Sequence, residues 1–208
     1  MTFTTDRPIQ QKPLNVDEFL SQYGGDKRYE LIDGEVFDLE PTGPHEQVAS
    51  FITKQVSVQI VVNEHPWAIL QRPLFRPSGS AATAFRPDVA VIDEVALAEE
   101  PLWAEQSILT RAESIKFVAE VVSSNWQNDY ARKFEDYEAL GIAEYWIADY
   151  AGLGGVYHIG RPKQPTLTVC QLGEDGRYEK LLLRGEQWVA SRLFPGLRLT
   201  AAQVLGIG

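Results

Sequence analysis

The stretch that decides the fold is residues 115–150, IKFVAEVVSSNWQNDYARKFEDYEALGIAEYWIADY. It contains two nearly all-apolar runs, residues 115–122 and 144–149, which are typical of strands covered on both faces of a sheet. Between them lies a polar stretch that Gly141 closes, and glycine is the residue that most often follows the end of a helix. The stretch therefore predicts a strand, a helix and a second strand.

The charged side chain of Glu120 lies in the middle of the first run, with apolar residues from Phe117 to Ala119 before it and Val121 and Val122 after it. An ionised carboxylate left unpaired in apolar surroundings costs several kcal/mol, so Glu120 needs a cation, a metal ion or a bound proton. After this strand, Asn128 or Asp129 caps the predicted helix, and Lys133 lies one turn beyond Asp129. Two interpretations of Glu120 stay open at this point: a buried acid paired with an arginine or lysine, and a ligand of a metal ion.

The residues before this stretch predict a short helix and a β-hairpin. Asn15 caps a helix over residues 15–23, and Gly24 ends it. The sequence YELIDGEVFDLE, which begins at Tyr29, contains an Asp-Gly pair at residues 33–34. Such a pair readily adopts the positive φ angles of a tight turn, so the sequence predicts a hairpin.

A longer helix and two strands are predicted between the hairpin and the deciding stretch. Apolar residues recur every fourth position from Val48 to Ile60, which favours a helix over residues 44–63. Residues 67–71 (WAILQ) and 87–93 (PDVAVID) are apolar runs of strand length.

The C-terminal part of the chain alternates apolar and polar residues. This pattern, typical of strands, occurs in VYHI (156–159), TLTVCQL (166–172) and YEKLLL (178–183). Asp175-Gly176 predicts a second hairpin turn, and Thr200 caps a final short helix that ends at Gly206. No internal repeat or linker divides the chain.

The order helix, three strands, helix, strand predicts an α/β fold with a mixed central sheet and added β-hairpins. We expect a single domain over residues 1–208. Its parts are a core of about 44–150, an N-terminal helix and hairpin over 15–40, and C-terminal β-hairpins over 155–208.

The net charge of −10 argues against a protein that coats nucleic acid through bulk electrostatic attraction. The charge is uneven, because residues 1–149 hold 12 Lys and Arg against 25 Asp and Glu, whereas residues 150–208 hold 7 against 4. Between residues 65 and 87 there is no acid, and three arginines occur there: Arg72, Arg76 and Arg86. They form either a local cationic rim or an ordinary set of surface arginines.

Cysteine usage and hydropathy indicate the compartment. The single cysteine, Cys170, excludes an internal disulfide and suits a reducing compartment. The first residues contain no apolar signal core, and no run approaches the ~18 apolar residues of a membrane span. We expect a cytoplasmic protein that does not enter a membrane.

Three acidic residues and a lysine gather in the predicted core. Asp88 begins one strand, Glu120 lies in the next, and Asp129 and Lys133 share a helix face. If the two strands are neighbours, Asp88 and Glu120 face each other, and like charges that close require a cation or a proton between them. Carboxylate oxygens are ligands that suit Mg²⁺ or Mn²⁺.

Five segments, taken in order, resemble a known family. YELIDGE, His45, RPDVAVID, EVVSSNWQNDYARKFEDY and GIAEYWIAD resemble the Uma-two family of restriction-endonuclease-like proteins, within the PD-(D/E)XK nuclease superfamily. The likeness covers residues 29–149 with compatible spacing throughout, and the short Pro87-Asp88 motif is the less specific part of it.

The resemblance implies a restriction-endonuclease-like core and a function. It implies a Mg²⁺ or Mn²⁺ ion held by Asp88, Glu120 and the carbonyl of Val121, and hydrolysis of phosphodiester bonds in nucleic acid, with DNA as the expected substrate. Because many nucleases of this superfamily pair to cut two strands, we expect a homodimer.

The sequence departs from the superfamily pattern at one position. The pattern places a lysine two residues after the glutamate, and Val122 stands there. In the Uma-two family this lysine appears in the following helix, which fits Lys133 as the catalytic cation. The alternative is a solvated helix residue paired with Asp129 or Tyr137.

Supporting roles are assigned to His45, Glu46 and Asp129. The family has a histidine at the position of His45, whereas sequence alone makes it a residue at a helix end. Glu46 would add a ligand through water, and Asp129 would cap its helix and position Lys133. Glu30 and Glu35 match the family hairpin and would brace the rim of the site.

Two functions from different classes remain. The first is a metal-dependent endonuclease with Asp88, Glu120 and Lys133 as its catalytic residues. The second is a non-catalytic interaction or DNA-binding module on a nuclease scaffold. Retention of both carboxylates and a lysine favours the enzyme. The two other histidines, His65 and His158, lack the partner spacing of a zinc site.

Overall fold

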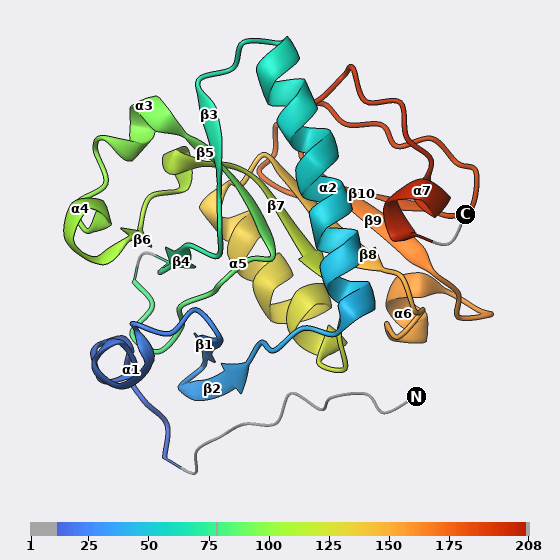
Figure 1. Ribbon diagram of the computed structural model, residues 1–208. Helices are drawn as coiled ribbons and strands as arrows, with labels where there is room; N and C mark the ends of the chain where they lie inside the picture. The colour runs from blue at the N-terminus through green and yellow to red at the C-terminus, as the bar shows by residue number, and fades with distance from the viewer. Residues whose placement is uncertain (1–11, 78, 207–208) are drawn as a thin grey trace.

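A six-stranded mixed β-sheet forms the centre of the computed structural model, which describes residues 12–77 and 79–206 (Figure 1). The strand order is β10-β9-β8-β7-β5-β3. These strands are β3 (Trp67–Leu70), β5 (Val89–Asp93), β7 (Ile115–Val121), β8 (Glu144–Asp149), β9 (Thr166–Leu172) and β10 (Tyr178–Leu183). Among the described strands of this sheet, only β7 and β8 pair in parallel. The prediction of an α/β protein with a mixed sheet is therefore confirmed.

Helices cover both faces of this sheet. In Figure 1, α2 (Gly43–Val62) crosses in front of the strands and α5 (Lys133–Leu140) lies behind them. The short helix α7 (Ala201–Leu205) packs on the same face as α2, and α6 (Val156–Ile159) packs on the face of α5. The crossover between the parallel strands β7 and β8 runs through α5, as parallel pairing requires.

The strand β7 contributes to both apolar layers through its alternation. Phe117 and Ala119 pack in the layer under α2, whereas Val118 and Val122 pack in the layer under α5. Successive side chains of a strand point to opposite faces, so Glu120 points to the α5 face. That face is where Lys133 begins α5.

The N-terminal predictions are confirmed in detail. The helix α1 (Val16–Tyr23) has Asn15 as its cap, with reciprocal hydrogen bonds between Asn15 and Glu18. The strands β1 (Tyr29–Ile32) and β2 (Glu35–Asp38) form the expected hairpin, and its turn has φ of 50° at Asp33 and 85° at Gly34. The long helix α2 buries the predicted apolar stripe: Val48, Ile52, Val56 and Ile60.

Short elements between β3 and β7 lie outside the sequence predictions. They are β4 (Leu74–Phe75), α3 (Glu94–Leu97), α4 (Trp103–Gln106), β6 (Ile108–Leu109) and the 3₁₀ turn η1 (Ala112–Ser114). The strands β4 and β6 pair in parallel and pack with α1 and the hairpin in a third apolar cluster. Elements of two to four residues are too short to show a period, which is why the sequence pattern missed them.

Two predictions about local structure are wrong. Residues 156–159 form α6 rather than a strand, because four residues bounded by Gly155 and Gly160 fit one helical turn as well as an alternation. Within the described residues, the C-terminal region therefore holds one hairpin, β9–β10, rather than several. The second error concerns the cap at residues 128–129: both residues lie inside the π-helical segment η2 (Asn128–Arg132), and neither side chain caps α5.

The remaining C-terminal elements agree with the sequence. The turn at Asp175-Gly176 joins β9 and β10, and α7 is capped by Thr200 and ends at Gly206. In the part of the chain that the structure describes, no helix is long and apolar enough to cross a membrane.

The buried stripe of α2 leads to a stability prediction. Val56 is fully buried. Val58 lies two residues further along the same helix, on its opposite side, and is 49% exposed. Val56→Ala should lower the free energy of unfolding by about 2 kcal/mol, because it removes buried apolar volume and leaves a cavity. Val58→Ala makes the same chemical change with little loss of burial, and should stay within about 0.5 kcal/mol of wild type. Urea denaturation of both variants measures the difference, and equal losses would contradict this packing of α2 on the sheet.

Candidate active site

Two carboxylates meet where β5 and β7 lie side by side. Val89 pairs with Ala119 in the antiparallel ladder, so one further step along this register sets Asp88 opposite Glu120. Oδ2 of Asp88 accepts a hydrogen bond from the main-chain N–H of Val121 at 2.8 Å. The side chains of both acids are largely buried, with Glu120 only 2% exposed. The two strands are neighbours, the condition that the sequence had left open, and both acids lie at one end of the sheet.

Lys133 reaches this pair from the first turn of α5. Its Nζ lies 3.2 Å from Oε1 of Glu120, 3.2 Å from Oε1 of Glu30 and 3.5 Å from Oδ1 of Asp129. The side chain is 4% exposed, which excludes the alternative of a solvated helix residue. Burial lowers the pKa of Lys133, but the surrounding carboxylates outweigh burial and hold this pKa well above its usual value. The ammonium is therefore charged at neutral pH.

The carboxylates themselves are short of positive charge. Burial raises the pKa of Glu120 well above its usual value; Lys133 opposes this shift, and the neighbouring acids reinforce it. Burial likewise raises the pKa of Asp129 to about 7, against the pull of Lys133. The cluster thus contains more acid than its cations neutralise, and a further cation would be bound favourably there.

His45 approaches from the N-terminal turn of α2. Its Nε2 lies 3.3 Å from Oδ2 of Asp88, and its Nδ1 is buried without a hydrogen-bond partner among the described residues. Burial lowers the pKa of His45, but the carboxylate of Asp88 outweighs burial and raises it overall. Figure 1 shows this end of α2 near the C-terminal end of β7, a strand that α2 contacts.

Glu46, the next residue, lies elsewhere. Its Oε1 pairs with the guanidinium of Arg72 at 3.0 Å, and its side chain lines a neighbouring cavity rather than the one at Glu120. Glu35 is exposed on the hairpin and lines neither cavity.

Glu30 and Tyr137 also belong to the cluster. From the sequence, Glu30 had only a bracing role at the rim, and Tyr137 was only an alternative partner of Lys133. Glu30 is 2% exposed and accepts a hydrogen bond from the main-chain N–H of Arg86 at 3.1 Å as well as contacting Lys133. The hydroxyl of Tyr137 donates to Oε1 of Glu120 at 2.9 Å. The signal for Glu30 was an acid in the apolar strand YELI, the same signal that marked Glu120.

A cavity of about 70 Å³ opens onto the cluster. Its lining includes six ionisable side chains: Glu30, His45, Asp88, Glu120, Asp129 and Lys133. The lining also includes Val121, the polar residues of the loop after β7, Arg86 and residues between β2 and α2. One water takes about 30 Å³ of liquid volume, so this space is large enough for a small ion with a water or two.

A π-helical turn brings Asp129 and Lys133 into the cluster. The helix begins at Trp126 and widens over η2, so the side chain of Asp129 points inward and is 6% exposed. The hydroxyl of Tyr145 on β8 donates to the main-chain carbonyl of Asp129 at 3.0 Å and anchors this turn to the sheet. Single π turns are rare and occur often at functional sites. The ring of Trp126 packs edge-on near the ring of His158.

The donor set fits a divalent ion in chemistry and in charge. Within residues 12–77 and 79–206, no three His, Cys, Asp or Glu side chains are grouped so as to hold a metal by themselves. The arrangement implied by the resemblance needs two carboxylates, Asp88 and Glu120, and the main-chain carbonyl of Val121, and all three residues line the cavity. Hard oxygen ligands and surplus negative charge suit Mg²⁺ or Mn²⁺.

The fold is that of a mixed α/β protein, and comparison with known proteins gives a similar structure and a family. A similar solved structure is described as "Crystal structure of a putative nuclease belonging to DUF820" from Anabaena variabilis ATCC 29413, with a TM-score of 0.69 and 16% identity over 94% of this chain and 99% of that chain. This likeness shows a shared mixed α/β fold. Residues 16–202 match the family Uma2, described as "Putative restriction endonuclease". The chain belongs to the Uma2 family, which confirms the resemblance; no curated protein matches it.

The raised pKa of Asp129 predicts how stability depends on pH. Between pH 4 and 7 the folded protein keeps a proton on Asp129 that the unfolded chain, with an ordinary pKa of 3.8, releases. Raising the pH through this window therefore lowers the free energy of unfolding. Asp129→Asn should remove part of this loss of stability, because asparagine does not titrate. The free energy of unfolding of the variant minus that of wild type should therefore be more positive at pH 8 than at pH 5. Urea denaturation at the two pH values measures the effect.

Asp93 offers a control of opposite sign. It lies at the other end of β5 and pairs with Nζ of Lys116 at 3.0 Å. Burial raises the pKa of Asp93, but Lys116 and two main-chain amides outweigh it, so this pKa is lowered overall. Asp93 therefore stabilises the fold above its unfolded pKa, and Asp93→Asn should lose stability at pH 8. The assignment for Asp129 is wrong if its variant and wild type follow the same pH dependence.

Proposed function

We propose that the protein is a metal-dependent endonuclease that hydrolyses phosphodiester bonds of nucleic acid, with DNA as the expected substrate. The observation that carries the proposal is the convergence of Asp88, Glu120 and Lys133 at one cavity, from two neighbouring strands and a helix. Membership of the Uma2 family supports it. The restriction-endonuclease-like core, a single domain, a homodimer and a cytoplasmic location remain predictions of the resemblance and of composition.

The side chains suggest how the chemistry is divided. Asp88, Glu120 and the carbonyl of Val121 would hold Mg²⁺ or Mn²⁺, which when bound lowers the pKa of a water and neutralises charge on the phosphate. Lys133 keeps its proton because its pKa is raised, so it stabilises developing negative charge and does not act as a base. His45 and Tyr137 fix the orientation of Asp88 and Glu120 through their contacts with Oδ2 and Oε1.

Metal binding is the first test. Glu120→Gln should leave the metal-free fold about as stable as wild type, because glutamine resembles the protonated acid that burial favours at this position. The variant should show at least a ten-fold weaker Mn²⁺ affinity by titration calorimetry, the scale of losing one charged ligand. Glu100→Gln is the control: Glu100 is also buried, but its carboxylate accepts hydrogen bonds from Thr110 and Arg111 away from the cavity. Unchanged Mn²⁺ affinity in Glu120→Gln would remove the metal site from the proposal.

Cleavage by a lysine variant is the second test. Lys133→Ala should lower the rate of plasmid cleavage in Mg²⁺ or Mn²⁺ by about 10²-fold or more, the scale of losing one preorganised electrostatic group. Its Mn²⁺ affinity should persist, since an ammonium is not a metal ligand. Lys116→Ala is a matched control, because Lys116 also pairs with a carboxylate across β5 and β7 but at their opposite end.

The two tests also separate the enzyme from the binding module. A module would bind nucleic acid, cut none of it in any divalent metal, and respond equally to the two lysine substitutions. Loss of cleavage in Lys133→Ala but not in Lys116→Ala, with the Mn²⁺ affinity of Lys133→Ala retained as the sign that its site is still folded, supports the enzyme. Equal rates for wild type and Lys133→Ala would contradict the catalytic role of this lysine.

A further inference from the structure

Arg72 has an unusual backbone conformation for its residue type. Its φ is 50°, in the left-handed region that glycine adopts at little cost and other residues adopt with strain. The next residue is Pro73, and a following proline restricts the backbone further. Strain of this kind persists where the surrounding structure enforces it, and it gathers at functional sites. The conformation of Arg72 therefore suggests that its side chain has a role at this position.

The strained conformation is held by two cations that bind main-chain carbonyls. NH1 of the Arg86 guanidinium donates to the carbonyl of Arg72 at 3.1 Å, and Nζ of Lys27 donates to the carbonyl of Gln71 at 2.9 Å. Arg86 is 4% exposed and also donates to the carbonyls of Tyr29 and Gly24. The carbonyls of residues 71–72 are therefore fixed by neighbouring cations, and the guanidinium of Arg72 is held at the surface.

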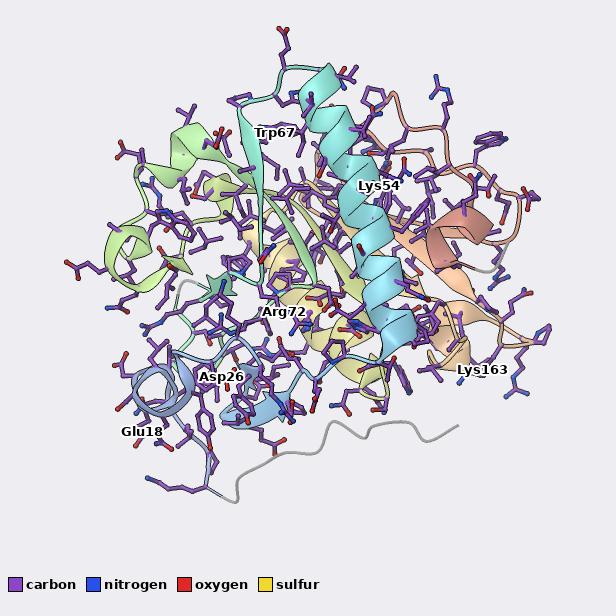
Figure 2. The ribbon with its side chains drawn as sticks, viewed as in Figure 1. Glu18, Asp26, Lys54, Trp67, Arg72 and Lys163 are labelled. Carbon is purple, nitrogen blue, oxygen red and sulfur yellow. The ribbon has the colours of Figure 1, made fainter. Side chains whose placement is uncertain are left out.

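That surface borders the candidate active site. A cavity of about 460 Å³ lies between α2 and the loop after β3, and its lining includes Arg72, Lys27, Glu46, Ser50 and Asp88. Asp88 lines this cavity and the cavity at Glu120, so the two spaces adjoin. Figure 2 shows Arg72 between the N-terminal half of α2 and the β1–β2 hairpin. A chain of phosphates that places one group at Asp88 would place a neighbouring group near Arg72.

The present partner of Arg72 is a weak one. NH2 of its guanidinium lies 3.0 Å from Oε1 of Glu46, whose side chain is 56% exposed. Exposed ion pairs contribute little to stability, because water competes for both charges. A phosphodiester offers the guanidinium two oxygens in a geometry that matches its fork of donors. A phosphate can therefore replace Glu46 as the partner of Arg72 with little loss of free energy.

The structure separates the three arginines of the acid-free stretch. Arg86 is buried and holds main-chain carbonyls. Arg76 pairs with Asp17 at 3.6 Å and lines a different cavity with Pro77. Arg86 lines the small cavity at Glu120, and Arg72 is the one of the three that lines the larger neighbouring cavity, to which Asp88 also belongs.

We propose that Arg72, aided by Lys27, binds a phosphodiester of the nucleic-acid strand next to the bond to be cut, and that Glu46 takes the place of this phosphate in the free protein. The inference rests on the proposed nuclease function and adds the residue that positions the strand. A protein of net charge −10 cannot attract nucleic acid by its overall charge, so it needs such local contacts.

Binding measured without catalysis tests the inference. A fluorescently labelled DNA duplex and its single strand are titrated with the full chain in EDTA, where metal-dependent cleavage is silent, and anisotropy gives Kd over a series of salt concentrations. Arg72→Ala should raise Kd about ten-fold for the better ligand and reduce the slope of log Kd against log salt by about 1, as expected for one lost phosphate contact. Arg76→Ala removes an arginine of similar exposure from the same stretch and should leave Kd within about two-fold of wild type.

A double-mutant cycle tests the role of Glu46. Glu46→Gln should tighten binding several-fold in the wild-type background, because the phosphate no longer competes with a carboxylate for Arg72. The gain should shrink when Arg72 is already alanine, since the two residues then have nothing to exchange. A general charge effect predicts the same gain in both backgrounds and would overturn the exchange.

The outcomes also separate this inference from the nuclease proposal. Equal Kd values for wild type, Arg72→Ala and Arg76→Ala, or no DNA binding by wild type at low salt, would overturn the role of Arg72. Absence of cleavage in any divalent metal, with the Arg72 effect on binding intact, would overturn the nuclease and leave a DNA-binding surface.

Discussion

The ammonium of Lys133 contacts carboxylates from three separate parts of the chain: Glu30 on β1, Glu120 on β7 and Asp129 in the π-helical turn η2. None of these acids could be buried beside the others without a cation, since the cost of desolvating each charge adds to their mutual repulsion. One lysine thus joins the hairpin, the sheet and the helix at a single point. Removal of one partner of such a buried pair leaves the other charge uncompensated, so the position of every element around it depends on this contact.

The backbone near the cluster is shaped to make this contact possible. The π turn at Asn128–Arg132 directs Asp129 inward, and Tyr145 fixes that turn by donating to a main-chain carbonyl. On the other side of the sheet end, Arg86 binds three carbonyls and gives its own N–H to Glu30. These contacts supply hydrogen bonds to main-chain carbonyls in addition to those that regular helix and sheet provide. The same contacts place acids, cations and an open cavity at one end of the molecule.

The charge of the cluster is unbalanced in a way that a purely structural network would avoid. Glu120 and Asp129 have raised pKa values, which means that burial and repulsion outweigh their attraction to Lys133. Some acids elsewhere are paired without this loss: Asp93 with Lys116 has a lowered pKa, and Glu138 beside Arg177 does as well. Others, such as Glu144 and Asp149, have pKa values that burial raises. The site differs from these in that several acids surround one buried cation, as is common where titratable groups serve a function.

The sequence by itself determined the strands of the central sheet and the two main helices, because periodicity and turn residues report local burial. It left the adjacency of Asp88 and Glu120 conditional, and the antiparallel pairing of β5 with β7 decided it. The family likeness then singled out Lys133, whose distance from Glu120 only the structure could supply. The parts that tertiary structure decided were the entry of Glu30 and Tyr137 into the cluster, the π turn, and the choice of Arg72 among three arginines. Each depends on how a hairpin, a helix and a loop far apart in the chain pack around one sheet end, and no local pattern encodes the contact between them.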